Sequence, residues 1–229
     1  MSEKSAEAVI QLMSLHEQPL LCPASGDTPT GLFKTLVEKY RAKKIDPSSW
    51  SFVGLDEWVG LNGNDEGSCR QYLDKNLFRP LNVPENKIIF FDGRAENLED
   101  ECKKTENFIQ QNKGLHVAIL GLGTNGHIGM NEPECDVAQH VHVVQLHPST
   151  IQAGQKYFQK PQPLDKGITL GIEGLMESRH IILLASGKHK AEIVKKVIKG
   201  EVTPKVPGSL LHNHPSCTVF LDADAASML

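Results

Sequence analysis

Hydrophobic residues along the chain occur in two alternating patterns, short continuous runs and helical spacing, and these patterns predict the elements of the fold. Short continuous apolar runs are typical of strands buried on both faces, whereas apolar residues spaced three or four apart mark one face of a helix. The strand-like runs cover residues 20–22, 51–55, 88–91, 115–120, 141–146, 167–172, 181–185 and 217–221. The helix-like segments cover residues 6–13, 32–40, 69–77, 97–112, 148–158 and 193–198.

Strands and helices alternate along the whole sequence. Because parallel strands need a long crossover connection, usually a helix, this order predicts a mostly parallel sheet with helices on both faces. The expected fold class is therefore α/β, a doubly wound, Rossmann-like sheet. No linker, repeat or low-complexity segment interrupts the pattern, so we expect one domain over residues 1–229.

Composition narrows the class of protein. A hydrophobic content of 39% and a charged content of 23% are ordinary for a globular domain. The net charge of -4 gives no reason to expect a nucleic acid or an anionic membrane as partner. Five scattered cysteines without a C-x-x-C pair fit a reducing compartment. The first 18 residues mix charged and apolar residues, unlike a signal peptide or membrane span, so we expect a cytoplasmic protein.

Candidate chemistry is concentrated just after the apolar run at residues 115–120. Gly121, Gly123 and Gly126 follow it, and glycines let a backbone turn sharply and approach a ligand closely. His127 and Glu132 come within the next six positions. Since ligands of α/β sheets bind at the carboxyl ends of strands, we predict an active site here.

The same glycines match the G-x-G-x-x-G pattern of dinucleotide-binding loops. Two features argue against that function. Pro133 interrupts the helix that should begin at the third glycine. No acidic residue ends the next strand, where a ribose would need one, and His147 stands there instead. We therefore expect no dinucleotide cofactor.

Two other strand ends carry candidate groups. The loop at residues 23–29 is small, glycine-bearing and hydroxylated, and a helix follows it, which is typical of an anion site. It can equally be an ordinary helix start with Thr28 as N-cap and Pro29 as the first helical residue. Asp56 and Glu57 end the second strand, where a surface acidic pair would be the simplest interpretation of the residues alone.

Four stretches together resemble one known family. Residues 123–133, GTNGHIGMNEP, resemble the G-x-N/D-G-H-I-x-F-N-E-P signature of glucosamine-6-phosphate deaminases and galactosamine-6-phosphate isomerases. Residues 25–29, 55–60 and 187–190 agree with that family in the same order, so the resemblance covers nearly the whole chain. The 6-phosphogluconolactonases share the fold, but they lack the N-E-P continuation and the D-E-W/Y-V-G stretch.

The resemblance implies an enzyme that isomerises and deaminates an amino-sugar 6-phosphate without metal or cofactor. Asp56 would be the base that moves a proton between C2 and C1 of the sugar. His127 would shuttle a proton during ring opening, and Glu132 would orient it and support its charged form. Asn125 occupies a position that is Asp in some relatives, so it can orient a neighbour but cannot act as a base.

The resemblance also implies a phosphate site, formed by Ser25, Gly26, Asp27, Thr28, Lys156 and Lys190. Lys156 aligns with an arginine of glucosamine enzymes, so the compact ammonium group of a lysine replaces a guanidinium that could form two parallel hydrogen bonds to the phosphate. Asp27 stands where many relatives have glycine, and it should point away because a carboxylate repels phosphate.

Trp58, the L-G-L-G run, Lys156 and the compact C-terminus are more similar to galactosamine-6-phosphate isomerases than to hexameric glucosamine enzymes. We therefore expect galactosamine 6-phosphate, or glucosamine 6-phosphate, as a small-molecule substrate of a monomer or small homo-oligomer. The alternatives are a non-catalytic sugar-phosphate sensor on the same fold and a 6-phosphogluconolactonase-like hydrolase. Retention of Asp56, His127 and Glu132 argues against a sensor, because binding alone would not need that set.

Two further expectations concern residues outside this set. His140 and His142 share a strand face, and His212 and His214 share a loop, but no carboxylate or cysteine is patterned with either pair. We therefore expect no metal site. Allosteric glucosamine enzymes resemble this chain up to N-E-P and then use basic residues for a second sugar phosphate. No Lys or Arg occurs here between Glu132 and Lys156, so we expect no such effector site.

Overall fold

The computed structural model describes residues 1–229, and its main feature is a six-stranded sheet. Its strands, in spatial order, are β4 (Ile88–Ile89), β2 (Ser51–Val53), β1 (Leu20–Pro23), β5 (Val117–Gly121), β8 (His180–Ala185) and β9 (Cys217–Leu221). Every neighbouring pair runs parallel. The chain adds strands on one side of β1 and then on the other, so the predicted doubly wound α/β class is confirmed.

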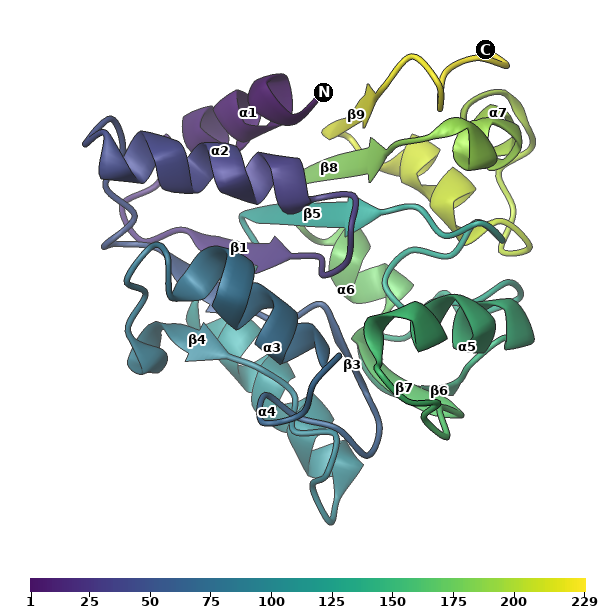
Figure 1. Ribbon diagram of the computed structural model, residues 1–229, viewed down its shortest axis with the longest axis horizontal. Helices are drawn as coiled ribbons and strands as arrows, with labels where there is room; N and C mark the ends of the chain where they lie inside the picture. The colour runs from purple at the N-terminus through teal and green to yellow at the C-terminus, as the bar shows by residue number, and fades with distance from the viewer.

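Helices cover both faces of this sheet (Figure 1). On one face lie α1 (Ser2–Ser14), α2 (Thr30–Arg41) and α3 (Cys69–Leu73), which continues into a π-helical turn at Asp74–Phe78. On the other lie α4 (Leu98–Gln111), α6 (Ile172–Met176) and α7 (Ala191–Lys199). Successive strand residues point to opposite faces of the sheet. Leu21 and Ile119 therefore belong to the hydrophobic cluster on the face covered by α1, α2 and α3, whereas Leu20 and Leu120 belong to the cluster on the face covered by α4, α6 and α7.

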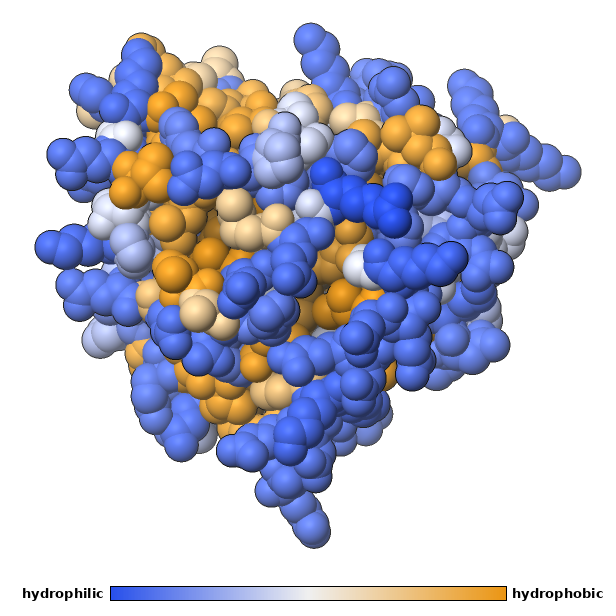
Figure 2. Space-filling view, turned by 180° about the vertical axis from the view of Figure 1, so that it is seen from behind, coloured by the Kyte–Doolittle hydropathy of each residue, from blue (hydrophilic) through white to orange (hydrophobic).

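The buried apolar residues of α1 lie on the face that the sequence pattern predicted. In α1 the apolar residues Ala6, Val9 and Met13 are fully buried. In α4 only Cys102 and Thr105 are buried, and most of its charged residues are exposed. Figure 2 shows this far side of the molecule, where hydrophilic residues cover the lower projection around α4. None of the helices is both long enough and apolar enough to cross a bilayer.

A second, three-stranded antiparallel sheet stands beside the first and was not foreseen. It is formed by β3 (Asp56–Trp58), β7 (Lys166–Leu170) and β6 (Val141–Gln145), in that order. We expected residues 141–146 and 167–172 to belong to the main sheet. Along β6 the side chains alternate between more buried and more exposed, which suits an antiparallel strand with one solvated face.

Two helix boundaries also differ from the expectation. Helix α2 begins at Thr30 with Pro29 as its N-cap and no side-chain cap, so Thr28 is not the cap. The expected helix at residues 148–158 is α5 (Pro148–Gly154) followed by a 3-10 turn at Gln155–Tyr157. The α-helix ends at Gly154, whose Cα packs too closely against the Trp58 ring and Leu164 to carry a side chain.

Candidate active site

The carboxyl ends of β1, β2, β5 and β8 surround one cavity of about 390 Å³. This is the edge at which an α/β sheet binds its ligands, as the sequence predicted. Eight of the predicted site residues line the cavity: Ser25, Gly26, Asp27, Thr28, Asp56, His127, Lys156 and Lys190. The other two, Asn125 and Glu132, do not line it and lie behind His127.

The loop after β1 forms one part of the cavity wall. Gly26 has a φ of 96°, in the left-handed region, and a Cβ there would lie 3.0 Å from the Tyr157 hydroxyl. A side chain at Gly26 would therefore be both strained and crowded. Tyr157 comes from the 3-10 turn after α5, the turn that also carries the predicted site residue Lys156, but Tyr157 itself was not predicted.

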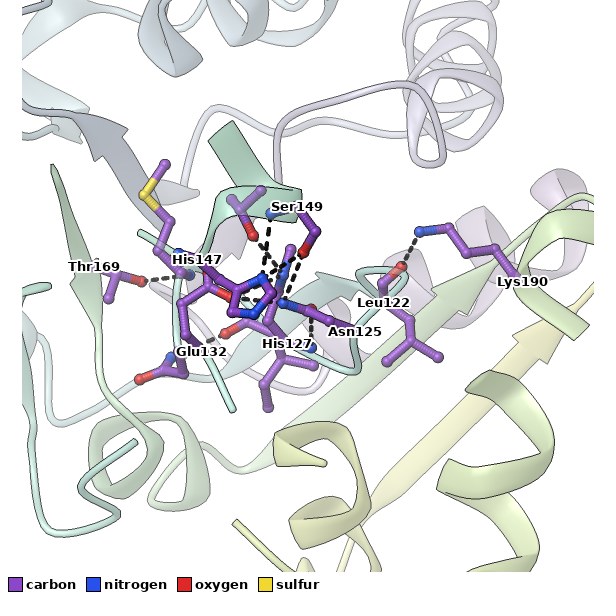
Figure 3. Close-up of polar contacts among 12 residues, drawn as sticks. Leu122, Asn125, His127, Glu132, His147, Ser149, Thr169 and Lys190 are labelled. Atoms are coloured by element: carbon purple, nitrogen blue, oxygen red, sulfur yellow. Dashed lines mark hydrogen bonds and ion pairs between the residues drawn. The ribbon is translucent and has the colours of Figure 1, made fainter. Parts of the chain in front are cut away.

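Lys190 is the more deeply placed cation of the cavity. Its Nζ donates a hydrogen bond to the Leu122 carbonyl oxygen at 2.6 Å (Figure 3). Burial, with a smaller contribution from the Lys156 charge, lowers the pKa of Lys190 to about 8. An ammonium that is costly to desolvate gains more from an incoming anion than an exposed one does, so this is a strong position for a phosphate ligand.

Lys156 is paired within the protein. Its Nζ lies 2.6 Å from Oδ2 of Asp27, and both side chains are more than half exposed, at 56% and 71%. Asp27 therefore neutralises part of the Lys156 charge instead of facing an anion unopposed. An exposed pair of this kind is weak and screened by solvent, so it can be exchanged for a phosphate contact.

Asp56 begins β3 and is only 8% exposed. Burial raises its pKa to about 6, against the opposing effects of the Cys69 thiol and the His127 charge. A carboxylate that resists ionisation near neutral pH is a stronger base than an exposed one. The structure thus gives Asp56 the properties that a general base requires.

The neighbouring carboxyl group, Glu57, points to the other side of β3 and has a structural role. Its oxygens accept hydrogen bonds from the backbone N–H groups of Trp58, Cys69 and Arg70 at 2.9 to 3.0 Å. Burial raises its pKa to about 7, although these three bonds favour the carboxylate. By holding the start of α3, Glu57 fixes Cys69 in the cavity wall beside Asp56.

The ring of His127 rests directly on the backbone of Gly123. A Cβ at Gly123 would overlap three atoms of the imidazole, so only glycine leaves room for the ring. The backbone of the two residues is also joined, because Gly123 N–H donates to the His127 carbonyl oxygen at 2.9 Å. Gly123 therefore positions the imidazole, and together with Gly121 it also lines the cavity.

Behind His127, Glu132 is the centre of a hydrogen-bond network (Figure 3). Its Oε2 lies 3.5 Å from Nδ1 of His127 and accepts a bond from Nδ2 of Asn125 at 2.8 Å. Its Oε1 accepts a bond from the His147 backbone N–H at 3.2 Å. Burial disfavours the Glu132 carboxylate, but hydrogen bonds and charge from His127, with bonds from Thr150 and Asn125, hold its pKa below the usual range.

Asn125 connects several parts of this network. Its Oδ1 accepts the His127 backbone N–H at 3.1 Å, and its Nδ2 also lies 3.3 Å from Oγ of Ser149. An aspartate at this position could not donate to Glu132, and two carboxylates would meet instead. The neutral amide is thus matched to an ionised Glu132.

The histidine pairs do not behave as pairs. His212 and His214 each contact a backbone carbonyl oxygen, of Val197 and Ser178, through Nε2. His140, the residue before β6, lies 3.9 Å from Glu173 of α6 and 3.3 Å from Glu177, the C-cap residue of α6, and the three side chains form a cluster at the surface. The sequence showed no carboxylate at metal-ligand spacing from His140, but it could not show these two glutamates, because they are more than 30 residues away along the chain.

Eight further residues line the cavity but were given no role at the site from the sequence, namely Leu55, Trp58, Cys69, Met130, Ser149, Thr150, Tyr157 and His189. Four of them, Cys69, Ser149, Thr150 and Tyr157, also lie outside the stretches that carry the family resemblance. For Ser149 and Thr150 the available indication was their place immediately after the strand that follows the N-E-P motif.

Comparison with known proteins shows the family to which the chain belongs. The model of the family described as glucosamine-6-phosphate isomerases/6-phosphogluconolactonase matches residues 1–220. The glucosamine-6-phosphate deaminase of Thermoanaerobacter pseudethanolicus is 39% identical over 230 residues, covering 100% of this chain and 91% of the relative. That of Clostridium botulinum is 38% identical and is covered to 94%.

Solved structures give the same result. A monomeric glucosamine-6-phosphate deaminase superposes with a TM-score of 0.96 at 32% identity, covering 100% of this chain and 95% of the other. The 6-phosphogluconolactonase of Trypanosoma cruzi superposes with a TM-score of 0.78 at 20% identity, over 100% of this chain and 92% of the other, which shows a shared fold. The chain therefore belongs to the glucosamine-6-phosphate isomerase and 6-phosphogluconolactonase family, and within it to the glucosamine-6-phosphate deaminase branch.

Proposed function

We propose that the protein converts an amino-sugar 6-phosphate to the ketohexose 6-phosphate and ammonia, with glucosamine 6-phosphate as the first candidate substrate. The relatives reported above carry the name of the glucosamine enzyme and match the whole chain. This favours glucosamine over the galactosamine substrate that Trp58 and Lys156 suggested. The observation that carries the proposal is one cavity containing a buried base, Asp56, an imidazole, His127, and the ammonium group of Lys190.

The phosphate of the substrate would bind at Lys190, Ser25 and the backbone of the loop at residues 26–28. Lys190 supplies a charge-assisted hydrogen bond, and it stays an ammonium below its pKa of about 8. Lys156 would add its charge by exchanging Asp27 for the phosphate.

Ring opening requires a proton to leave the C1 hydroxyl and a proton to reach the ring oxygen. His127 is suited to both steps, because Nδ1 is held by the protein while Nε2 has no hydrogen-bond partner within it. The ionised Glu132 would stabilise the imidazolium that forms between the two transfers.

Isomerisation then requires a base at C2. The Asp56 carboxylate would remove the C2 proton, giving an enolamine, and return the proton to C1. The product is an imine at C2, which water hydrolyses to the ketone and ammonia. The raised pKa of Asp56, about 6, lies close enough to neutrality for the group to take and return a proton.

The test is to incubate the purified protein with glucosamine 6-phosphate, galactosamine 6-phosphate and 6-phosphogluconolactone and to measure ammonia and lactone hydrolysis. Asp56→Asn, purified in the same way, controls for a contaminating deaminase. We expect ammonia from glucosamine 6-phosphate with the wild type only. Ammonia from the galactosamine compound alone would change the substrate. Lactone hydrolysis without ammonia, or binding without turnover, would refute the proposal in favour of a hydrolase or a sensor.

A further inference from the structure

The hydroxyl group of Thr150 lies beside both members of the acid–base pair. Its Oγ1 is 3.2 Å from Nδ1 of His127, closer than Glu132, whose Oε2 is 3.5 Å from the same nitrogen. We propose that Thr150 is a positioning residue that joins His127 to Glu132 and holds the imidazole with its proton on Nδ1. This inference rests on the proposed function and adds a residue to its mechanism.

The direction of the two hydrogen bonds follows from what each group can do. A neutral imidazole has one N–H, and a hydroxyl can donate one hydrogen bond while accepting another. Glu132 is held ionised and can only accept. We assign Nδ1–H of His127 as the donor to Oγ1 of Thr150, which leaves the Thr150 hydroxyl free to donate to the Glu132 carboxylate that it helps to hold ionised.

This arrangement has a consequence for the other ring nitrogen. With the proton on Nδ1, the Nε2 atom carries a free lone pair, and no protein group contacts it by hydrogen bonding. Since His127 lines the cavity, Nε2 is left as the atom that can accept a proton from a substrate. The opposite tautomer would put a lone pair on Nδ1, next to a carboxylate, which is unfavourable.

The fold holds the Thr150 hydroxyl in place. Thr150 is only 6% exposed and lies in the first turn of α5, where its N–H donates to the His147 carbonyl oxygen at 2.9 Å. The side chain of His147 caps the same turn by accepting the Ser149 N–H, and the His147 backbone N–H binds Glu132. A β-branched side chain has few rotamers, so little freedom is lost in ordering its hydroxyl.

The test compares Thr150→Val, which keeps the shape and removes the hydroxyl, with Thr150→Ser, which keeps the hydroxyl. The matched control is Thr105→Val. Thr105 is equally buried, in α4 and outside the cavity, and its hydroxyl has no hydrogen-bond partner. For each variant we would measure kcat and KM for ammonia release, and the imidazole tautomer of His127 by ¹⁵N NMR of the ligand-free protein at a pH where the ring is neutral.

We expect Thr150→Val to lower kcat roughly tenfold, the effect of losing one hydrogen bond to a charged network, with KM changed less than about twofold. The Nδ1–H tautomer should be dominant in the wild type and lose population in Thr150→Val. Thr150→Ser should restore both properties, and Thr105→Val should match the wild type in both.

Two results would overturn the proposal. One is an unchanged tautomer together with a kcat within about twofold of the wild type in Thr150→Val. The other is a Thr150→Ser variant as impaired as Thr150→Val, which would mean that the methyl group matters through packing. If the wild type releases no ammonia from any amino-sugar phosphate, the proposed function fails, while the NMR comparison still decides the role of Thr150.

Discussion

Replacement of Asp56 by Asn should make the protein more stable and almost inactive. The carboxyl group is buried, and its pKa rises from 3.8 in a free side chain to about 6 in the folded protein. Between these two values the folded protein keeps a proton that the unfolded chain has released. A rise in pH through this window therefore favours the unfolded state, and the whole cost is present above about pH 6.

The size of this cost follows from the shift in pKa. About two units at about 1.4 kcal/mol each correspond to roughly 3 kcal/mol of lost stability at pH 7.5 and to less than about 1 kcal/mol at pH 4. Asparagine has nearly the same shape and never ionises. The Asp56→Asn variant should thus unfold with a free energy up to about 3 kcal/mol higher at pH 7.5, which is roughly 6–12 °C in Tm for a chain of this size.

Urea unfolding at pH 4 and at pH 7.5 measures the effect, with Asp224→Asn, the same change at an exposed carboxyl group, as the control. Ammonia release should fall roughly 10²–10⁴-fold in Asp56→Asn, the usual cost of losing a general base. In the wild type, kcat/KM should rise with pH through about 6 as Asp56 ionises. A stability difference that is the same at both pH values would refute the argument from burial. Near-normal ammonia release would refute the assignment of the base.

Three further outcomes are expected. Gly123→Ala should lower kcat roughly 100-fold at a nearly unchanged Tm, because a Cβ there displaces the imidazole of His127 from its productive position; a kcat equal to wild type would disprove that contact. Lys190→Met should raise KM roughly 10- to 100-fold with a smaller change in kcat, and the wild-type KM should rise above about pH 8 as the ammonium loses its proton; a KM independent of both would place the phosphate elsewhere. Initial rates should follow a hyperbola and ignore N-acetylglucosamine 6-phosphate, because β6 offers His142, whose pKa is lowered by burial, in place of a permanent cation; a sigmoidal curve that this compound makes hyperbolic would contradict the expectation.

The sequence by itself determined most of the elements and their apolar faces. Ala6, Val9 and Met13 recur at helical spacing and are buried together, and the run at residues 117–120 is buried on both faces of the sheet. These properties are local, because the period of a few neighbouring residues decides which side of an element is apolar. The motif at residues 123–133 likewise lies in one short segment of the chain, and the grouping of Asn125, His127 and Glu132 that the family resemblance implied is present in the structure.

Tertiary structure alone decided the parts that join distant segments. Asp56 pairs with Thr169 in the second sheet, and Lys156 contacts Asp27. No local sequence pattern predicts either contact. The same holds for Thr150, an unremarked hydroxyl until α5 is packed against the loop that carries His127. The physical reason is that periodicity fixes which face of an element is apolar, whereas the partner of a polar side chain depends on how the elements pack. A hydroxyl, a thiol or a lysine can be satisfied by water as well as by protein, so only the packed chain shows which partner it takes.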